Sequence, residues 1–470
     1  MSTANELLNR LKTSPRALAV AEVLFLGVIL AWPIPLNKYL LVTTDSQAYV
    51  ETSYWLSPTV NWPMGYGMVF YVIRKLTMWE SLWASIIVQL LFVSSVFVRA
   101  TRVLAPELKP KLRLALYVVL GLTSLPWYAS QFMTDSLLPS AALMLAMALF
   151  SDVPGRLERA FYFASTIVIA TTHYSVPPIL TLVFGAAALL LLTLRRSGWK
   201  PVAGLGALVV GCWIAIPLLH YSFTQKAIYS RSTHNVLMSK LYSFGLLERF
   251  KQEHCPSAEY KLCGYDGAFS GTVGFYLWSG PIIKHLGGWD DSREESMKVV
   301  KRVAKDHPGL VLWGAIKDFG EQLVTFKIGD TLFRIPTDDT IDITLKTRYP
   351  RDHKQFARSR QQHQKLPLKT VTWIQLVVAI LSFAGAIAAA VHLAMRRAWT
   401  REKLAVALFL LAFMVANAAV TGILSNPADR YQARVIPLLV MIAGIVGAFA
   451  VRRPAERPAS GGAEAATQAA

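Results

Sequence analysis

A carboxylate stands in the first polar connection of the chain, at Asp45 in the segment TTDSQAYVE (residues 43–51). No Lys or Arg occurs between residues 43 and 62, so this connection supplies no counter-ion of its own. An unpaired carboxylate that faces a cavity is suited to accept a proton or to orient a cation. A structural interpretation stays open beside this one. Thr44 and Gln47 are spaced as in a capping box, which predicts a short helix with Asp45 in its first turn, where an acidic residue stabilises the helix dipole.

Other polar residues stand at the borders of apolar runs, and each has two interpretations. Asp135 follows Thr134 and either caps the next helix or is a second carboxylate in the same cavity as Asp45. His173 is either an interfacial hydrogen-bonding residue or a group that acts on a substrate. Arg430 and Arg434 precede the last apolar run. Such a pair either extends to the membrane surface or binds phosphate, for which the planar guanidinium group is well suited.

The composition requires a membrane around these residues. Of 470 residues, 54% are hydrophobic and only 16% are charged, against about 25% in ordinary soluble domains. So little polar surface cannot cover so much apolar mass in water, and the net charge of +19 is therefore no indication of a soluble nucleic-acid-binding protein. With 28 Gly, 24 Pro and 3 Cys, the chain is neither collagen-like nor a disulfide scaffold.

Ten apolar stretches approach the roughly 17–25 residues that cross about 30 Å of hydrocarbon. We therefore predict an all-α polytopic membrane protein of about ten transmembrane helices. The predicted spans are residues 17–36, 81–98, 112–129, 136–151, 159–175, 176–194, 201–221, 371–395, 404–424 and 435–451.

Basic residues sort to one side of this arrangement. If the N-terminus is cytoplasmic, the cytoplasmic segments and span edges carry twenty Lys and Arg residues, whereas the short outside loops carry only Arg430 and Arg434. Short loops rich in Lys and Arg stay in the cytoplasm. The sequence thus predicts an integral protein of a bacterial inner membrane with both termini cytoplasmic.

One long connection lies outside the membrane in this topology. Residues 222–370 are rich in aromatic residues and turn signals, which predicts a folded periplasmic region on the membrane. Within residues 293–326 we expect two amphipathic helices, with Pro308 at the start of the second. Cys255 and Cys263 are eight residues apart in a compartment that permits disulfides, and both the bonded and the free state stay open.

The predicted organisation has four parts. An N-terminal transmembrane module contains the first outside loop, in which an amphipathic helix ending at Arg74-Lys75 lies in the membrane interface. The outside domain and the last spans follow, and a disordered cytoplasmic tail ends the chain. In order, the parts are residues 1–221 (with the loop at 43–80), 222–370, 371–451 and 452–470.

Four short motifs follow one another on the predicted outer side: Asp45-Ser46-Gln47-Ala48-Tyr49, Asn61-Trp62-Pro63-Met64-Gly65-Tyr66, Asp135, and Arg430-Tyr431. Their order resembles the GT-C superfamily of polytopic glycosyltransferases, in particular the branch of protein O-mannosyltransferases and lipid A aminoarabinose transferases. Those enzymes have an Asp-Glu-x-x-Tyr-like motif, a Lys-Pro-Pro-x-Gly-Tyr-like segment, an acidic residue between spans three and four, and a late Arg-Tyr pair. Here Ser46 replaces the Glu and Asn61 replaces the Lys. The resemblance covers about the first 200 residues well and the last 50 loosely.

The resemblance implies a GT-C-like bundle and a membrane glycosyltransferase that moves a sugar from a polyprenyl-phosphate donor to a lipid, polysaccharide or protein acceptor. Asp45 and Asp135 would be catalytic. Arg430 would bind the donor phosphate, with His173 or Lys38 in place of the missing Lys. Tyr49, Glu51, Asn61, Tyr66 and Tyr431 would line the substrate cavity. No cofactor and no nucleic-acid partner is indicated, and a divalent metal ion on Asp45 and Asp135 stays open.

Two other functions remain in competition with a transferase. An O-antigen-type polymerase or ligase also has many spans and one large outside loop, and arginines dominate its loop; Arg348, Arg351, Arg358 and Arg360 fit that pattern. The other is a non-enzymatic transporter or assembly scaffold. The lack of an obvious internal repeat and of centrally placed charges in the spans argues against a transporter.

Overall fold

Helices make up the regular structure of this protein. The computed structural model describes residues 14–59, 62–195, 198–255, 259–267, 269, 273–274, 276–277 and 280–451. These residues contain no strand, and a single isolated parallel bridge joins Leu41 to Gln131. The predicted all-α class is therefore confirmed.

Seven helical segments of the described chain are long and apolar enough to cross a membrane. An integral multi-pass protein follows from their number and length. The segments are Pro15–Asn37 (α2, Pro15–Leu30, with α3, Pro33–Asn37), Trp83–Leu104 (α6), Val176–Arg195 (α11, Val176–Leu190, with a π-helical turn, Leu191–Arg195), Trp199–Thr224 (α12), Leu368–Met395 (α21), Arg401–Leu424 (α22) and Asp429–Ala450 (α23, Asp429–Ala433, with α24, Ile436–Ala450).

The other three predicted spans form shorter helices. They are α7 (Pro110–Gly121, followed by the single turn α8, Leu125–Ala129), α9 (Leu137–Phe150) and α10 (Arg156–Ala170). These helices have 12, 14 and 15 residues. Nearly every residue of α9 is buried, so protein and not lipid surrounds this helix. Its length is therefore not set by the thickness of a bilayer.

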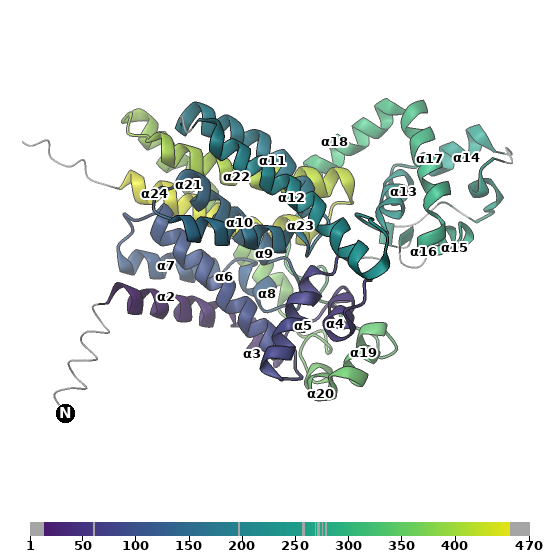
Figure 1. The fold of residues 1–470 in the computed structure, drawn as a ribbon, viewed down its shortest axis with the longest axis horizontal. Coiled ribbons are helices and arrows are strands. Elements are labelled where there is room, and N and C mark those ends of the chain that lie inside the picture. Colours follow the sequence, from purple (N-terminus) through teal and green to yellow (C-terminus); the bar gives the residue numbers. More distant parts are fainter. Residues whose placement is uncertain are drawn as a thin grey trace, which may run out of the picture.

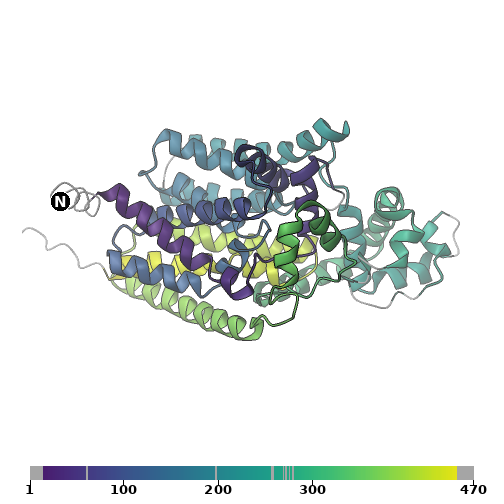
Figure 2. The ribbon, with the colours of Figure 1, turned by 90° about the horizontal axis from the view of Figure 1, so that it is seen from below.

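The long helices run side by side and give the bundle two distinct ends (Figures 1 and 2). At the first end, where α2 begins and α24 ends, Glu22 of α2 accepts hydrogen bonds from Arg102 at 3.0 Å and from Arg113 at 2.9 Å. We call it the terminal end. At the opposite end α3 leads into α4 (Ser46–Trp55), which follows Asp45, and we call this the Asp45 end.

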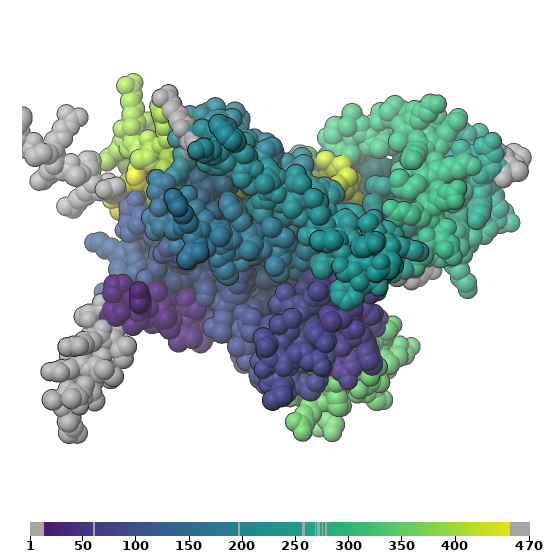
Figure 3. Space-filling view, viewed as in Figure 1, coloured from purple at the N-terminus to yellow at the C-terminus, as the bar shows by residue number. Residues whose placement is uncertain are grey.

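A separate lobe projects from the Asp45 end of the bundle (Figure 3). It has its own hydrophobic cluster, in which Met238, Leu247, Phe250 and Val299 are fully or almost fully buried. Cys255 and Cys263 form a disulfide within the lobe. The lobe comprises the described residues between 233 and 306, with α13 (Thr233–Ser243), α14 (Leu246–His254), a 3₁₀ turn (Lys261–Gly264), α15 (Pro281–His285), α16 (Gly288–Asp291) and α17 (Arg293–Asp306).

The chain returns from the lobe to the bundle through α18 (Pro308–Val324). The predicted pair of amphipathic helices is thus confirmed as α17 and α18, and α18 begins at Pro308 as expected. Two later helices, α19 (Thr340–Arg348) and α20 (Pro350–Ala357), belong to the bundle, because Leu345 and Phe356 lie in its main hydrophobic cluster.

Candidate active site

The connection before α4 is fixed to the connection before α9 by the bridge between Leu41 and Gln131. The two segments run parallel there, and Asp45 and Asp135 each follow the bridged residue of their own segment by four positions. The hydroxyl of Ser46 adds a hydrogen bond of 2.9 Å to the carbonyl of Phe132 in the opposite segment. The two acidic residues are therefore held in neighbouring segments at the Asp45 end.

Asp45 forms an ion pair with Arg430, which lies 385 positions away in sequence. Each side chain of the pair retains only 11% of its exposure. The expectation of an unpaired carboxylate is therefore wrong, because the last span supplies the cation that the Asp45 connection lacks. Arg430 in turn is positioned through its backbone, whose amide donates to Asp330 at 3.1 Å.

The predicted capping box is also wrong. The helix α4 begins at Ser46, and Asp45 occupies the cap position without a hydrogen bond from its side chain to the helix. The local turn is closed by Ser46 instead, whose hydroxyl accepts a hydrogen bond of 3.0 Å from the amide of Thr43. The tertiary ion pair with Arg430 thus takes the place of a local cap.

A second and deeper ion pair joins Arg434 to Asp135 at 3.1 Å, with both side chains 1% exposed. Arg434 also donates to the side-chain oxygen of Asn417 in α22, at 2.9 Å from Nη2. Arg434 therefore neither extends to the membrane surface nor is open to a ligand. Asp135 does not face an open cavity, although its Oδ2 atom is buried without a hydrogen-bond partner.

A hydrogen-bonded chain runs from this deeper pair to His173. Arg434 donates to the hydroxyl of Ser175 at 3.1 Å, and that hydroxyl lies 2.8 Å from Nδ1 of His173. The Ser175 amide also donates to Nδ1, at 3.1 Å, so Nδ1 is an acceptor and the imidazole proton resides on Nε2. Burial, with the nearby guanidinium groups of Arg434 and Arg430, lowers the pKa of His173 well below its ordinary value. His173 is therefore a neutral hydrogen-bond donor and not a cation.

Aromatic rings enclose the Asp45–Arg430 pair. The Arg430 guanidinium carbon lies 5.7 Å from the ring centre of Trp62 and 5.1 Å from that of Tyr431. Trp62 and Tyr431 also flank His173, at centroid distances of 5.8 and 6.4 Å. The pair, the imidazole and the two rings thus form one cluster, which we call the Asp45–Arg430 site.

Gly65, at the start of α5 (Gly65–Thr77), allows this cluster to assemble. Its amide donates to the carbonyl of Thr171 at 3.0 Å, and a Cβ atom at this position would lie 2.0 Å from the Thr171 hydroxyl oxygen. Only glycine permits so close an approach. It brings Trp62, three residues before α5, against His173, two residues after Thr171.

Among the residues predicted to line the cavity, Tyr49 lies close enough to both carboxylates to be affected by their charges. It is buried and packs edge-on against Tyr66 at 4.8 Å. Burial raises the pKa of the Tyr49 hydroxyl well above its ordinary value, and the charges of Asp45 and Asp135 add to this effect. The hydroxyl therefore stays protonated at neutral pH.

Tyr66, Glu51 and Lys38 form no hydrogen bond or ion pair with Asp45 or Arg430 among the described residues. The Tyr66 hydroxyl donates to Gln89 at 2.6 Å, so Tyr66 is part of the packed interior. Glu51 accepts a hydrogen bond of 3.1 Å from Gln47 on the surface of α4. The side chain of Lys38 is exposed and makes no hydrogen bond or ion pair with the described residues, whereas its backbone amide donates to the carbonyl of Pro35 at 3.3 Å. Asn61 lies outside the residues that the structure describes.

The side chains of the site do not suit a divalent metal ion. Asp45 and Asp135 are each paired with an arginine, and two guanidinium groups already balance the two carboxylates. Nowhere in the described part of the chain do three His, Cys, Asp or Glu residues come together as metal ligands. We therefore derive no chemical step from a metal ion.

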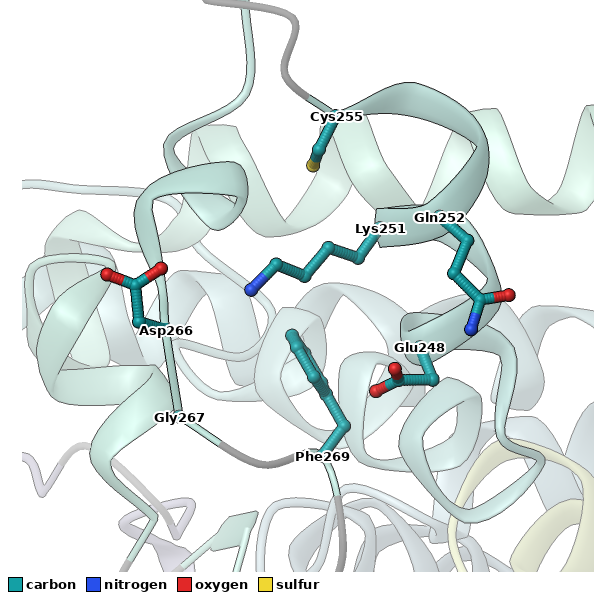
Figure 4. A pocket seen from close by; sticks show the side chains of 7 residues that line it. All are labelled: Glu248, Lys251, Gln252, Cys255, Asp266, Gly267 and Phe269. Atoms are coloured by element: carbon teal, nitrogen blue, oxygen red, sulfur yellow. The ribbon is translucent and has the colours of Figure 1, made fainter.

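A hollow on the lobe is remote from this chemistry (Figure 4). Its wall includes Glu248, Gln252, Asp266 and Phe269, and it contains no residue of the Asp45–Arg430 site. The ammonium group of Lys251 donates to the carbonyl of Tyr265, so its position is fixed by the lobe itself.

Sequence reasoning left the partners of Arg434 unassigned. Asn417 is a lone amide in the apolar helix α22, and this polar residue was the available signal. Ser175 follows His173 by two residues, a spacing at which its hydroxyl reaches the imidazole nitrogen.

Comparisons of this chain with protein-family models, with curated proteins and with solved structures found no match.

Proposed function

We propose that this chain is a membrane glycosyltransferase of the GT-C type, which moves a sugar from a polyprenyl-phosphate donor to an envelope acceptor. The observation that carries the proposal is the ion pair between Asp45 and Arg430. A carboxylate and a guanidinium group at one end of a bundle of apolar helices supply the base and the phosphate ligand that this reaction requires.

The proposed topology places the Asp45 end in the periplasm of a bacterial inner membrane and both chain termini in the cytoplasm. In this topology three further segments, namely α7 with α8, α9 and α10, complete a set of ten membrane segments. The distribution of basic residues supports it, since the connections at the terminal end are rich in Lys and Arg and the short ones at the Asp45 end are poor in them.

The proposed reaction begins with an exchange of partners at Arg430. The donor phosphate binds Arg430, and the Asp45 carboxylate is thereby released. The acceptor hydroxyl oxygen then attacks the anomeric carbon of the sugar, and the bond between that carbon and the phosphate oxygen breaks. The acceptor proton passes to Asp45, and polyprenyl phosphate leaves with its negative charge on Arg430.

His173 and Tyr431 complete the proposed donor site. The Nε2–H group of His173 donates a hydrogen bond to a phosphate oxygen, and the neutral imidazole needs no counter-ion. Tyr431 offers its ring beside the Arg430 guanidinium group. Asp135 supports the site by holding Arg434, and Lys38 receives no role because it contacts neither residue of the pair.

The proposal is tested by analysis of envelope glycans and glycolipids in cells with and without the protein, with mass spectrometry as the readout. We expect one sugar decoration to disappear when the chain is absent and to return with the wild-type chain but not with Asp45→Asn. Glu51→Gln is the matched control, because it removes the same charge six residues further along the chain and away from the pair, and it should restore the decoration. If the cells without the protein make shortened polymers instead, the chain is a polysaccharide polymerase and the proposal is wrong. If their envelope is unchanged, the chain is neither a transferase of this kind nor a polymerase.

A further inference from the structure

The helix α18 (Pro308–Val324) buries small and polar residues and exposes apolar ones, which is the reverse of a helix on the surface of a water-soluble domain. The side chains that it buries are small or polar, namely Gly314, Asp318 and Gln322. These residues are spaced by four positions and therefore lie on one face. A helix in water buries its apolar face instead. The face of α18 opposite these three residues is therefore expected to contact something other than water.

The opposite face of α18 is apolar and exposed. Trp313 and Leu312 retain 66% and 61% of their exposure, and Ile316, Leu323 and Val324 are exposed as well. At 100° per residue, all five side chains fall within about a third of the helix circumference. Lys317 and Glu321, both exposed, flank this apolar face on one side. Such an unbroken apolar face on a monomer marks a surface that contacts another apolar phase.

The buried face of α18 is fixed to the bundle by a charged contact. Lys240 of α13 donates to the carboxylate of Asp318 and to the carbonyl of Gly422 in α22, the latter at 2.7 Å. A Cβ atom on Gly422 would lie 2.8 Å from the Asp318 carbonyl oxygen, so the two helices touch at this glycine. The position of α18 is therefore set by the end of a membrane-spanning helix.

The apolar face of α18 continues the lipid-facing surface of α22. Ile423 and Leu424, directly after the contact at Gly422, are exposed apolar residues at the Asp45 end of that span. Leu323 and Val324 lie in the adjoining turn of α18, because Asp318 and Gly422 are in contact. Figures 1 and 3 show α18 at the edge of the molecule, where it joins the bundle to the lobe.

We propose that α18 lies in the membrane interface at the Asp45 end and binds lipid through Leu312, Trp313, Ile316, Leu323 and Val324. The partner is the bilayer that surrounds the spanning helices, and the continuity with α22 selects it over a partner protein. Trp313 has the side chain that is typical of the boundary between acyl chains and headgroups. The inference does not depend on the reaction that the chain catalyses.

Lipid contact at α18 also bears on the Asp45–Arg430 site. The Gln322 amide pairs with both backbone groups of Ala428, at 3.0 Å in each direction. Ala428 stands two residues before Arg430, so the helix that lies in lipid fixes the start of the segment that carries Arg430. The lobe and the site are thereby held at a defined height above the membrane.

The test uses the full chain in lipid nanodiscs with a nitroxide label at one introduced cysteine. Cys212 is buried and the other two cysteines form a disulfide, so the label attaches to the new position. Oxygen partitions into lipid and a nickel chelate stays in water, and the ratio of the two collision rates reports the surroundings of the label. The test positions are Ile316→Cys and Leu312→Cys.

Two exposed positions calibrate the ratio. Leu381→Cys in the middle of α21 gives the value for lipid, and Lys301→Cys on α17 gives the value for water. We expect Ile316→Cys to exceed Lys301→Cys severalfold in its ratio of oxygen to nickel collisions and to stay below Leu381→Cys, because the interface is shallower than the middle of a span. A ratio like that of Lys301→Cys at both test positions would overturn the inference. Weak collisions with both reagents would overturn it as well, because they would show that protein covers the face.

Discussion

Asp45→Asn should separate donor binding from turnover, because it frees Arg430 while it removes the proposed base. Asn has nearly the same shape as Asp, so the helix α4 and the abundance of the protein in the membrane should be unchanged. The substitution removes the negative charge that now holds the Arg430 guanidinium group. A phosphate that binds Arg430 then has no carboxylate to displace.

The magnitude follows from the exchange of one hydrogen bond for another. A hydrogen bond to a charged group contributes about 1.5–3 kcal/mol, and a neutral one about 1 kcal/mol. The two side chains of the pair are 11% exposed, so water screens this difference little. Relief of about 0.5–2 kcal/mol corresponds to a dissociation constant for polyprenyl phosphate that is about 2–30-fold lower. The rate of transfer should fall by about 10²–10⁴-fold with loss of the general base.

Two measurements on purified protein in nanodiscs check this prediction. Binding of polyprenyl phosphate without a sugar gives the affinity, and single-turnover transfer from the sugar-bearing donor gives the rate. Glu51→Gln removes the same charge from α4 and should leave both quantities near their wild-type values. Arg430→Ala should weaken the binding of polyprenyl phosphate and raise the donor concentration at which the transfer rate is half of its maximum.

The outcome that refutes the reasoning is specific. If Asp45→Asn binds polyprenyl phosphate no more tightly than the wild-type protein, Arg430 does not have to leave Asp45 when the phosphate binds. If Asp45→Asn transfers the sugar at the wild-type rate, Asp45 is not the base. If no variant binds the lipid phosphate, the proposed donor class itself is wrong.

Three further predictions concern the surroundings of the site. Arg434→Met leaves Asp135 charged and buried, so thermal unfolding in micelles should show a loss of about 3–5 kcal/mol, and Asp135→Leu in the same chain should recover much of it. The lowered pKa of His173 means that the unfolded chain takes up a proton that the folded chain does not. Stability should thus decline as the pH falls below about 6.5, and titrations of wild type and His173→Gln should differ in this slope. Replacing Cys255 by Ser opens a loop of eight residues, which should speed hydrogen exchange in the lobe by the equivalent of about 2–3 kcal/mol.

The class and the longest helices of this fold could be predicted because they depend on local composition. A run of about 20 apolar residues has few alternatives to a spanning helix, and seven of the ten predicted runs have that length in the structure. The run at α9 is different, because hydropathy does not distinguish a helix buried in protein from one in lipid. Pro308 likewise marked the start of α18 through its own fixed backbone angle.

The pairing of charges could not be predicted in the same way. Asp45 and Arg430 are 385 positions apart, and Asp135 and Arg434 are 299 apart. Nothing in either segment states which distant connection it will meet, so Asp45 alone looked like a helix cap or an unpaired base. The Asp45 carboxylate pairs with the buried Arg430 guanidinium group and does not cap α4. Arg430 comes within reach of Asp45 only when the bundle is assembled.

The buried pair of Arg434 and Asp135 has a consequence for how the protein is made. Arg434 lies within the apolar segment Asp429–Ala450, and an arginine inside a span is costly to place in lipid. Its counter-ion, Asp135, belongs to a connection that is synthesised about 300 residues earlier. We therefore expect this segment to contact the earlier helices as it leaves the translocation channel. A chain that stops before Asp429 would leave Asp135 without its cation.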